Sequence, residues 1–337
     1  MANKQTVLVT GATGFIAKHC ILRLLDAGYQ VRGSVRSMDR ADSLRDVLGK
    51  HADVTDLSLV ELDLMSDAGW ADAVQGCAFV QHVASPFPAA DPKHEDDLII
   101  PAREGALRAL RFCSNAGVKR LVLTSSMAAI AYGEQTREAG PFTEKDWTNA
   151  DSQIGAYIKS KTLAERAAWD FIGSDAAKGM ELSVINPGAV FGPLLDNTWS
   201  TSGELIRRLV ARDMPACPRI SFVSIDVRDV AEAHYQAMIR PEAAGERFLL
   251  ATQPAWIVDI SKTLAANGYN TPTGVLPDFL VKLIGIFDKS IRMISKDLNQ
   301  QKEISNQKLR DVLQIEPRNL EEMSVSMAKT MQEYGVV

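Results

Sequence analysis

Short runs of consecutive apolar residues alternate, in the first half of the chain, with longer segments in which apolar residues recur every three or four positions. The short runs are typical of strands buried on both faces, and the longer segments are typical of amphipathic helices. The pattern predicts strands at 6–10, 30–35, 57–63, 78–83, 120–124 and 182–186, and helices between them at 15–27, 70–74, 96–116 and 156–177. Such alternation predicts parallel strands joined by right-handed helical crossovers.

The pattern changes after residue 193. Helices predominate there, at 203–212, 226–238, 257–267, 277–294 and 320–334, with an apolar stretch at 220–225, a strand at 246–251 and a solvated loop at 296–307. The fold class is therefore α/β, a Rossmann-type doubly wound parallel sheet with a smaller mixed, mainly helical C-terminal lobe. We expect residues 1–193 to form the sheet domain, with part of 226–251 returning to it, and 194–337 to form mainly the second lobe.

Charge and composition exclude several classes of protein. The chain has 337 residues, of which 42 are acidic and 37 basic, so its net charge is −5. A nucleic-acid surface would need an excess of basic groups. Neither a membrane helix nor a secretory signal peptide is indicated. The cysteines are widely spaced, without metal-ligand spacing, so we expect no metal site and buried free thiols in a reducing cytoplasm. They are Cys20, Cys77, Cys113 and Cys217.

The first predicted strand ends in a glycine-rich turn that leads directly into a helix. Gly11 can make the tight turn, Gly14 lets the backbone approach a pyrophosphate, and Ala17 is small enough for close helix packing. The N–H groups and the dipole at the helix N-terminus suit phosphate. Glycines also occur in ordinary turns, but this position between a strand and a helix predicts a dinucleotide site.

The end of the second strand indicates which dinucleotide binds. Arg36 follows the strand where an acidic residue would accept hydrogen bonds from the ribose of NAD. Its guanidinium suits a 2′-phosphate instead, and Arg40 is close enough to join it. The alternative is a solvated basic turn. We favour NADPH/NADP⁺, with Asp63 and Leu64 at the adenine edge, although Asp63 can equally cap its own loop.

Three residues near the ends of later elements suit proton transfer. Tyr157 and Lys161 are four residues apart on a predicted helix and therefore share a face. A nearby ammonium, together with the positive ring of an oxidised nicotinamide, lowers the pKa of a tyrosine, which can then exchange a proton with a reacting oxygen. Ser126 follows the fifth strand and can polarise a carbonyl, with Ser125 as the alternative if the register differs by one. A core tyrosine, a surface lysine and a serine-rich turn are the structural alternatives.

At this point the chain resembles the extended short-chain dehydrogenases/reductases over nearly its whole length. The resemblance rests on TGATGFIA at 10–17, HVASP at 82–86, LTSS at 123–126, the Tyr157 to Glu165 segment, NPGAVFGP at 186–193 and RDVAEAH at 228–234. VRGSVR at 31–36 is most similar to the dihydroflavonol reductase-like branch, which includes cinnamoyl-CoA reductases and microbial aldehyde and ketone reductases. The loop at 127–156 differs in composition from that of the plant flavonoid enzymes, so we do not infer a flavonoid substrate.

The resemblance implies a catalytic triad of Ser126, Tyr157 and Lys161 in an NADP-dependent carbonyl reductase. It makes residues 1–193 the NADP-binding domain and the C-terminal lobe the substrate-binding part. The residues that match cofactor-binding positions are Gly11, Thr13, Gly14, Phe15, Ile16, Arg36, Arg40, Asp63, Leu64, Val83, Ala84, Ser85, Tyr157, Lys161, Pro187, Gly188 and Val190.

The predicted substrate pocket is mostly apolar, which favours a small apolar or aromatic aldehyde or ketone over a sugar nucleotide. Its candidate residues are Pro86, Phe87, Met127, Ala128, Trp199, Met214 and Phe222. Two other functions remain open, an epimerase or dehydratase of the same fold and a non-catalytic redox sensor. Arg36 argues against the first, since such epimerases usually hold NAD, and the intact Tyr157 and Lys161 argue against the second. Monomer and homodimer are both compatible with the sequence.

Overall fold

The computed structural model describes residues 4–85, 92, 94–133, 140–287 and 297–337. Within these residues the central sheet has seven strands, all parallel. In spatial order the strands are β11 (Arg247–Leu250), β6 (Glu181–Pro187), β5 (Arg120–Thr124), β4 (Cys77–His82), β1 (Thr6–Val9), β2 (Gln30–Val35) and β3 (Leu57–Glu61).

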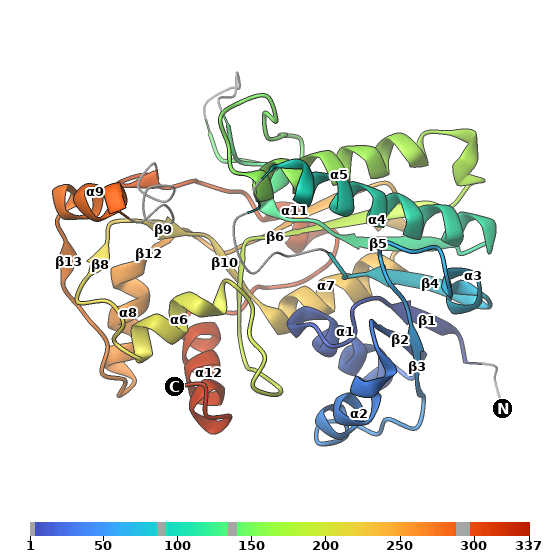
Figure 1. Ribbon diagram of the computed structural model, residues 1–337, viewed down its shortest axis with the longest axis horizontal. Coiled ribbons are helices and arrows are strands. Elements are labelled where there is room, and N and C mark those ends of the chain that lie inside the picture. The colour runs from blue at the N-terminus through green and yellow to red at the C-terminus, as the bar shows by residue number, and fades with distance from the viewer. Residues whose placement is uncertain (1–3, 86–91, 93, 134–139, 288–296) are drawn as a thin grey trace.

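Helices cover both faces of this sheet, as Figure 1 shows. The long helices α4 (Asp96–Asn115) and α5 (Ala156–Ile172) pack together on one face, and α1 (Phe15–Asp26) packs with α7 (Val227–Ile239) on the other. The short helices α2 (Ala41–Gly49) and α3 (Trp70–Val74) follow β2 and β3. Because helices cover both faces of the sheet, most residues of its strands are buried, as are the last three residues of β1.

The order of the strands reverses next to β1, which pairs with β2 on one side and with β4 on the other. The loops that leave β1 and β4 therefore diverge to opposite faces and leave a crevice between them. Ligands of doubly wound sheets bind at such a switch point. The loop after β1 begins at Thr10, and the loop after β4 begins at Val83.

The C-terminal lobe contains short two-stranded sheets and helices. Its strand pairs are β7 (Ala189–Phe191) with β10 (Ser224–Asp226), β9 (Ser221–Phe222) with β12 (Ala255–Trp256), and β8 (Cys217–Pro218) with β13 (Val275–Leu276). Its helices are α6 (Gly203–Val210), α8 (Ile257–Ala266), α9 (Asp278–Phe287) and α12 (Leu320–Glu333), whereas α11 (Gln307–Asp311) packs against β11 at the edge of the central sheet.

The predicted α/β fold is confirmed. The strand predicted at 246–251 is β11, which lies at the edge of the sheet beside β6, whereas α2 was not predicted. The predicted solvated loop at 296–307 holds only in part for the described residues. Asn299, Gln300, Gln301, Glu303 and Gln307 are exposed, but Leu298, Ile304 and Asn306 are buried. Ile304 also bridges to Phe142. All four cysteines are buried and free, as predicted.

Candidate active site

The loop after β1 is built for close approach by a ligand. Gly11 has φ +71°, and a Cβ atom there would lie 3.0 Å from the Cβ of Ala84. The position therefore needs glycine for both its backbone conformation and its space. Gly14 begins α1 without a side-chain cap, so the first N–H groups of the helix remain available. Ser34 of β2 fixes the loop by accepting hydrogen bonds from Gly11 and Ala12. This cradle fits a pyrophosphate.

The two arginines predicted to bind a 2′-phosphate follow β2. Both Arg36 and Arg40 are exposed. In the described part of the chain, neither guanidinium has a hydrogen-bond or ion-pair partner in the protein. Their N–H donors are therefore available to an anion at the open end of the crevice. Together with the glycine loop they fit a dinucleotide that carries an additional phosphate.

The predicted adenine edge follows β3. The Oδ1 atom of Asp63 accepts a hydrogen bond of 2.8 Å from the backbone of Met65, so Asp63 caps its own loop. This is the alternative that the sequence left open, and a contact of Asp63 with adenine stays a prediction. Leu64 is half-buried and lies against Gly105 of α4, where a Cβ atom would be 3.4 Å away.

The structure brings Ser126 and Tyr157 together. Tyr157 lies in the first turn of α5, and its side chain is hydrogen-bonded to that of Ser126. The Ser126 hydroxyl also accepts a hydrogen bond of 3.1 Å from the backbone of Ala128, which lies in a short helix that begins at Met127 just after β5. Ser125 points elsewhere and donates to Glu165 at 2.5 Å. The register therefore selects Ser126 as the partner of Tyr157.

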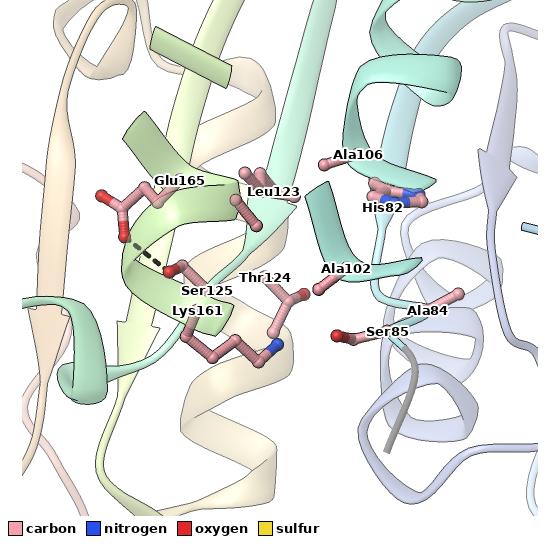
Figure 2. A pocket seen from close by; sticks show the side chains of 11 residues that line it. His82, Ala84, Ser85, Ala102, Ala106, Leu123, Thr124, Ser125, Lys161 and Glu165 are labelled. Carbon is pink, nitrogen blue, oxygen red and sulfur yellow. Dashed lines mark hydrogen bonds between the residues drawn. The ribbon is translucent and has the colours of Figure 1, made fainter. Parts of the chain in front are cut away.

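Lys161 lies one turn further along α5 and reaches into a cavity beside the switch point. Figure 2 shows its side chain extending past Thr124 toward the loop that carries Ala84 and Ser85. The cavity lies between β4, β5, α4 and α5, and small residues of α4 leave it open. It is lined by His82, Ala84, Ser85, Ala102, Ala106, Leu123, Thr124, Ser125, Lys161, Ala164 and Glu165.

Burial dominates the proton affinities of the site. It lowers the pKa of Lys161 to about 8, against the opposing charge of Glu165. It raises the pKa of Tyr157 above its ordinary value, and the hydrogen bond from Ser126 opposes that rise. The sequence led us to expect a lowered tyrosine pKa beside both Lys161 and an oxidised nicotinamide, and in the chain without a cofactor that pKa is raised instead. The reason is desolvation, which disfavours the phenolate.

The predicted nicotinamide side lies at the start of the C-terminal lobe. Pro187 ends β6, and Val190 is buried in β7. Gly188 stands between them, where a Cβ atom would come within 2.5 Å of the carbonyl oxygen of Val223. Backbone packing therefore requires glycine at this position.

The predicted substrate residues are spread over more of the structure than the predicted catalytic residues. Pro86 and Phe87 lie outside the described residues. Met127 and Ala128 are buried directly after Ser126. The remaining candidates lie on the C-terminal lobe: Trp199 is 38% exposed, and Met214 and Phe222 are half-buried. Their part in substrate binding stays a prediction.

Sequence reasoning assigned no role to several polar residues behind the site. Thr10 accepts a hydrogen bond of 3.0 Å from the backbone of Ala84 and contacts His82 at 3.0 Å, so it joins the β1 and β4 loops. His234 contacts Thr124 at 2.7 Å. Buried polar side chains at the ends of strands are the signal that could have identified them.

Two further findings concern the whole described chain. No group of three histidine, cysteine, aspartate or glutamate side chains among the described residues is arranged to hold a metal ion. In the same residues, every helix is too short or too polar to cross a bilayer.

Comparisons with known proteins identify the class. Residues 7–251 match the NAD dependent epimerase/dehydratase family. The chain belongs to this family, which confirms its resemblance to the extended short-chain dehydrogenases/reductases.

Individual relatives show which members of the family the chain is similar to. The chain is 36% identical over 253 residues to a cinnamoyl-CoA reductase of Medicago truncatula, covering 73% of this chain and 76% of that protein. It is 36% identical over 322 residues to a ketoreductase of Aspergillus niger, covering 88% and 94%. The crystal structure of the yeast methylglyoxal/isovaleraldehyde reductase Gre2 with NADPH superposes with a TM-score of 0.80 at 28% identity, covering 99% of this chain and 100% of that chain.

Proposed function

We propose that this protein reduces the carbonyl group of a small apolar or aromatic ketone or aldehyde to an alcohol, with NADPH as the reductant. The coarse activity, that of an NADP-dependent oxidoreductase acting on carbonyl groups, follows from the family and from reductases that match the chain over most of its length. The observation that carries the finer proposal is the pairing of Ser126 with Tyr157, with Lys161 one turn away, beside the glycine loop.

NADPH supplies the hydride that adds to the carbonyl carbon and is left as NADP⁺. The protein's own residues handle the proton and the geometry. Tyr157 donates its phenolic proton to the carbonyl oxygen, which completes the alcohol, and Ser126 donates a hydrogen bond that polarises the same oxygen. Lys161 holds the nicotinamide ribose, and its ammonium favours the phenolate that remains on Tyr157.

Cofactor binding in this proposal uses separate groups for each phosphate. The N-terminus of α1 and the loop at Gly11 and Gly14 hold the pyrophosphate. Arg36 and Arg40 hold the 2′-phosphate, which supports NADPH over NADH. Pro187, Gly188 and Val190 support the nicotinamide. A cytoplasmic location and the choice between monomer and homodimer stay predictions.

The first experiment follows NADPH absorbance during incubation with aliphatic and aromatic aldehydes, ketones and β-keto esters, with NADH in parallel. We expect turnover with NADPH on at least one carbonyl class. Tight NADPH binding without turnover on any of them would favour the epimerase or the redox sensor, and nucleotide sugars would then be tested.

A substitution tests the assigned proton donor. Tyr157→Phe should lower turnover by about 10³-fold, within the range for loss of general acid catalysis, while NADPH binding is retained. Tyr29→Phe is the matched control, because Tyr29 lies in the turn before β2 and packs against Tyr235, away from the crevice. Loss of NADPH binding in Tyr157→Phe would instead identify a structural tyrosine.

A further inference from the structure

A buried carboxylate stands directly behind the catalytic serine. Glu165 lies in α5, and its side chain is 0% exposed. One of its oxygens accepts hydrogen bonds from Ser125 at 2.5 Å and from Asn186 at 2.7 Å. The other accepts from Arg247 at 2.6 Å and from Trp169 at 3.4 Å. Donors from α5, β6, β11 and the end of β5 therefore converge on one carboxylate.

The cation of this cluster, Arg247, is also held by several groups. Arg247 is buried and donates to the backbone carbonyls of Glu144 and Asp146 at 2.8 Å. Its guanidinium also lies 3.7 Å from the centre of the Trp147 ring. Buried ion pairs usually add little stability compared with apolar residues of similar volume, because both charges lose their hydration. The pair therefore suggests a role beyond stability.

Two of the residues that donate hydrogen bonds to Glu165 connect it to the active site. Ser125 immediately precedes Ser126, and Figure 2 shows its hydrogen bond to Glu165. Asn186, which donates to Glu165, also donates to the backbone carbonyl of Ser126 at 3.1 Å. Asn186 immediately precedes Pro187 at the predicted nicotinamide side. The carboxylate thus holds the backbone on both sides of the Ser126 hydroxyl.

A third link is electrostatic. Lys161 lies one helical turn before Glu165, and the negative charge of Glu165 raises the pKa of Lys161 against burial. The other groups that face Lys161 do not replace this charge. His82 of β4 has its pKa held at about 4 by burial and by Lys161, so it stays neutral. The cavity wall from α4 contributes alanines, and β5 contributes uncharged hydroxyls.

We propose that Glu165 is a positioning residue for the reaction, which holds Ser126 against Tyr157 through Ser125 and Asn186 and places a carboxylate one helical turn from Lys161. The inference rests on the proposed function, since it concerns the same triad. Arg247 has a supporting part, because its guanidinium pairs with the buried carboxylate of Glu165 away from water.

Glu165→Gln tests the role of the charge, because glutamine keeps the shape and one acceptor oxygen. We expect the alkaline limit of kcat/KM, measured with a carbonyl that the wild type reduces, to move down by about one pH unit. At pH 9 the variant should therefore lose roughly 10-fold more activity than at pH 6. Asp170→Asn is the matched control, since it removes an exposed carboxylate from the same helix and should leave the profile unchanged.

Direct titration of Lys161 separates this inference from the proposed function. The side-chain amine can be followed by NMR in lysine-labelled protein without substrate, with its signal assigned from Lys161→Met. We expect the midpoint near pH 8 in the wild type to move lower in Glu165→Gln. An unchanged midpoint in a folded variant would refute the charge coupling, whether or not the wild type reduces carbonyls.

A second variant covers the case in which Glu165→Gln does not fold because Arg247 is left unpaired. Glu165→Gln combined with Arg247→Met removes both charges and should fold. Its Lys161 midpoint should move in the same direction by a smaller amount, because a cation has also left. A midpoint equal to that of the wild type would overturn the proposal. If the midpoint moves while the wild type reduces no carbonyl, the proposed function fails alone.

Discussion

Arg36 and Arg40 are the side chains whose surroundings bear most directly on the choice between NADPH and NADH. They are exposed, and within the described chain no acidic side chain pairs with either guanidinium. Arg36→Glu should therefore repel a 2′-phosphate and accept ribose hydroxyls instead. We expect the ratio of kcat/KM for NADPH to that for NADH to fall by about 10²-fold, roughly the worth of two charge-assisted hydrogen bonds.

Lys50→Glu provides the comparison for this substitution. It makes the same change of charge on an exposed residue at the far end of α2. The cofactor ratio should change little there, because exposed charges more than about 10 Å apart are screened in 0.1 M salt. A ratio that stays the same in Arg36→Glu would place the 2′-phosphate at another group.

The proposed catalytic role of Lys161 conflicts with the stability of the fold, because its ammonium is buried. Burial holds its pKa at about 8, below the usual 10.5. Below pH 8 both the folded and the unfolded chain bind the proton, so the full cost of burying the ammonium is present. Between pH 8 and 10.5 the unfolded chain binds more protons, so stability rises with pH, and above 10.5 the cost is gone.

Lys161→Met should therefore stabilise the protein while it impairs catalysis. We expect the free energy of unfolding at pH 7 to rise by about 1–3 kcal/mol, and this gain to shrink from pH 8 to 10.5. Thermal unfolding of both proteins at several pH values measures the difference. Lys329→Met, at an ammonium that is 71% exposed, should show no such gain. A lower stability of Lys161→Met at pH 7 would contradict this account of burial.

At the scale of elements, the sequence predicts best where the period of apolar residues is regular. The bounds of β2, α3 and β5 agree with the prediction, because each is a short apolar or helical run with clear ends. The helix α2 was missed because its nine residues are mostly polar or small. The described part of 296–307 was predicted only in part, since Ile304 and Leu298 are buried among polar neighbours that suggest a solvated loop.

The element α12 offers a test of how the C-terminal lobe is held together. Met327 is fully buried, and its side chain packs against Gly203 at the start of α6, where a Cβ atom would be 3.2 Å from it. Met327→Ala should lower the free energy of unfolding by about 2–5 kcal/mol through lost contacts and a residual cavity. Denaturant unfolding measures this change, and Lys329→Ala on the exposed side of α12 should change it by less than about 0.5 kcal/mol.

At the scale of the whole molecule, the sequence predicts which strand ends carry the site but not what supports them. Parallel strands bring their carboxyl ends to one edge, so Gly11, Ser126 and Tyr157 could be grouped in advance. The choice between Ser125 and Ser126 needed the register of β5, which only the structure gives. Glu165 and Arg247 are 82 residues apart, and no local pattern predicts their pairing.

The proposed dinucleotide site draws on loops after β1, β4, β5 and β6 and on α5, so a cofactor bound there would contact several elements of the central sheet. A ligand that binds only the folded chain stabilises it in proportion to the logarithm of its concentration. NADPH at 100 times its Kd should therefore add about 2.7 kcal/mol to the free energy of unfolding. Thermal unfolding at rising NADPH concentration measures this gain in stability.

At equal concentration NADH should stabilise the protein less than NADPH, and Arg36→Glu should remove that difference. Tyr157→Phe should keep the full stabilisation by NADPH, because the phenol of Tyr157 is proposed to act on the substrate oxygen. Equal stabilisation of the wild type by NADH and NADPH would contradict the assigned 2′-phosphate site.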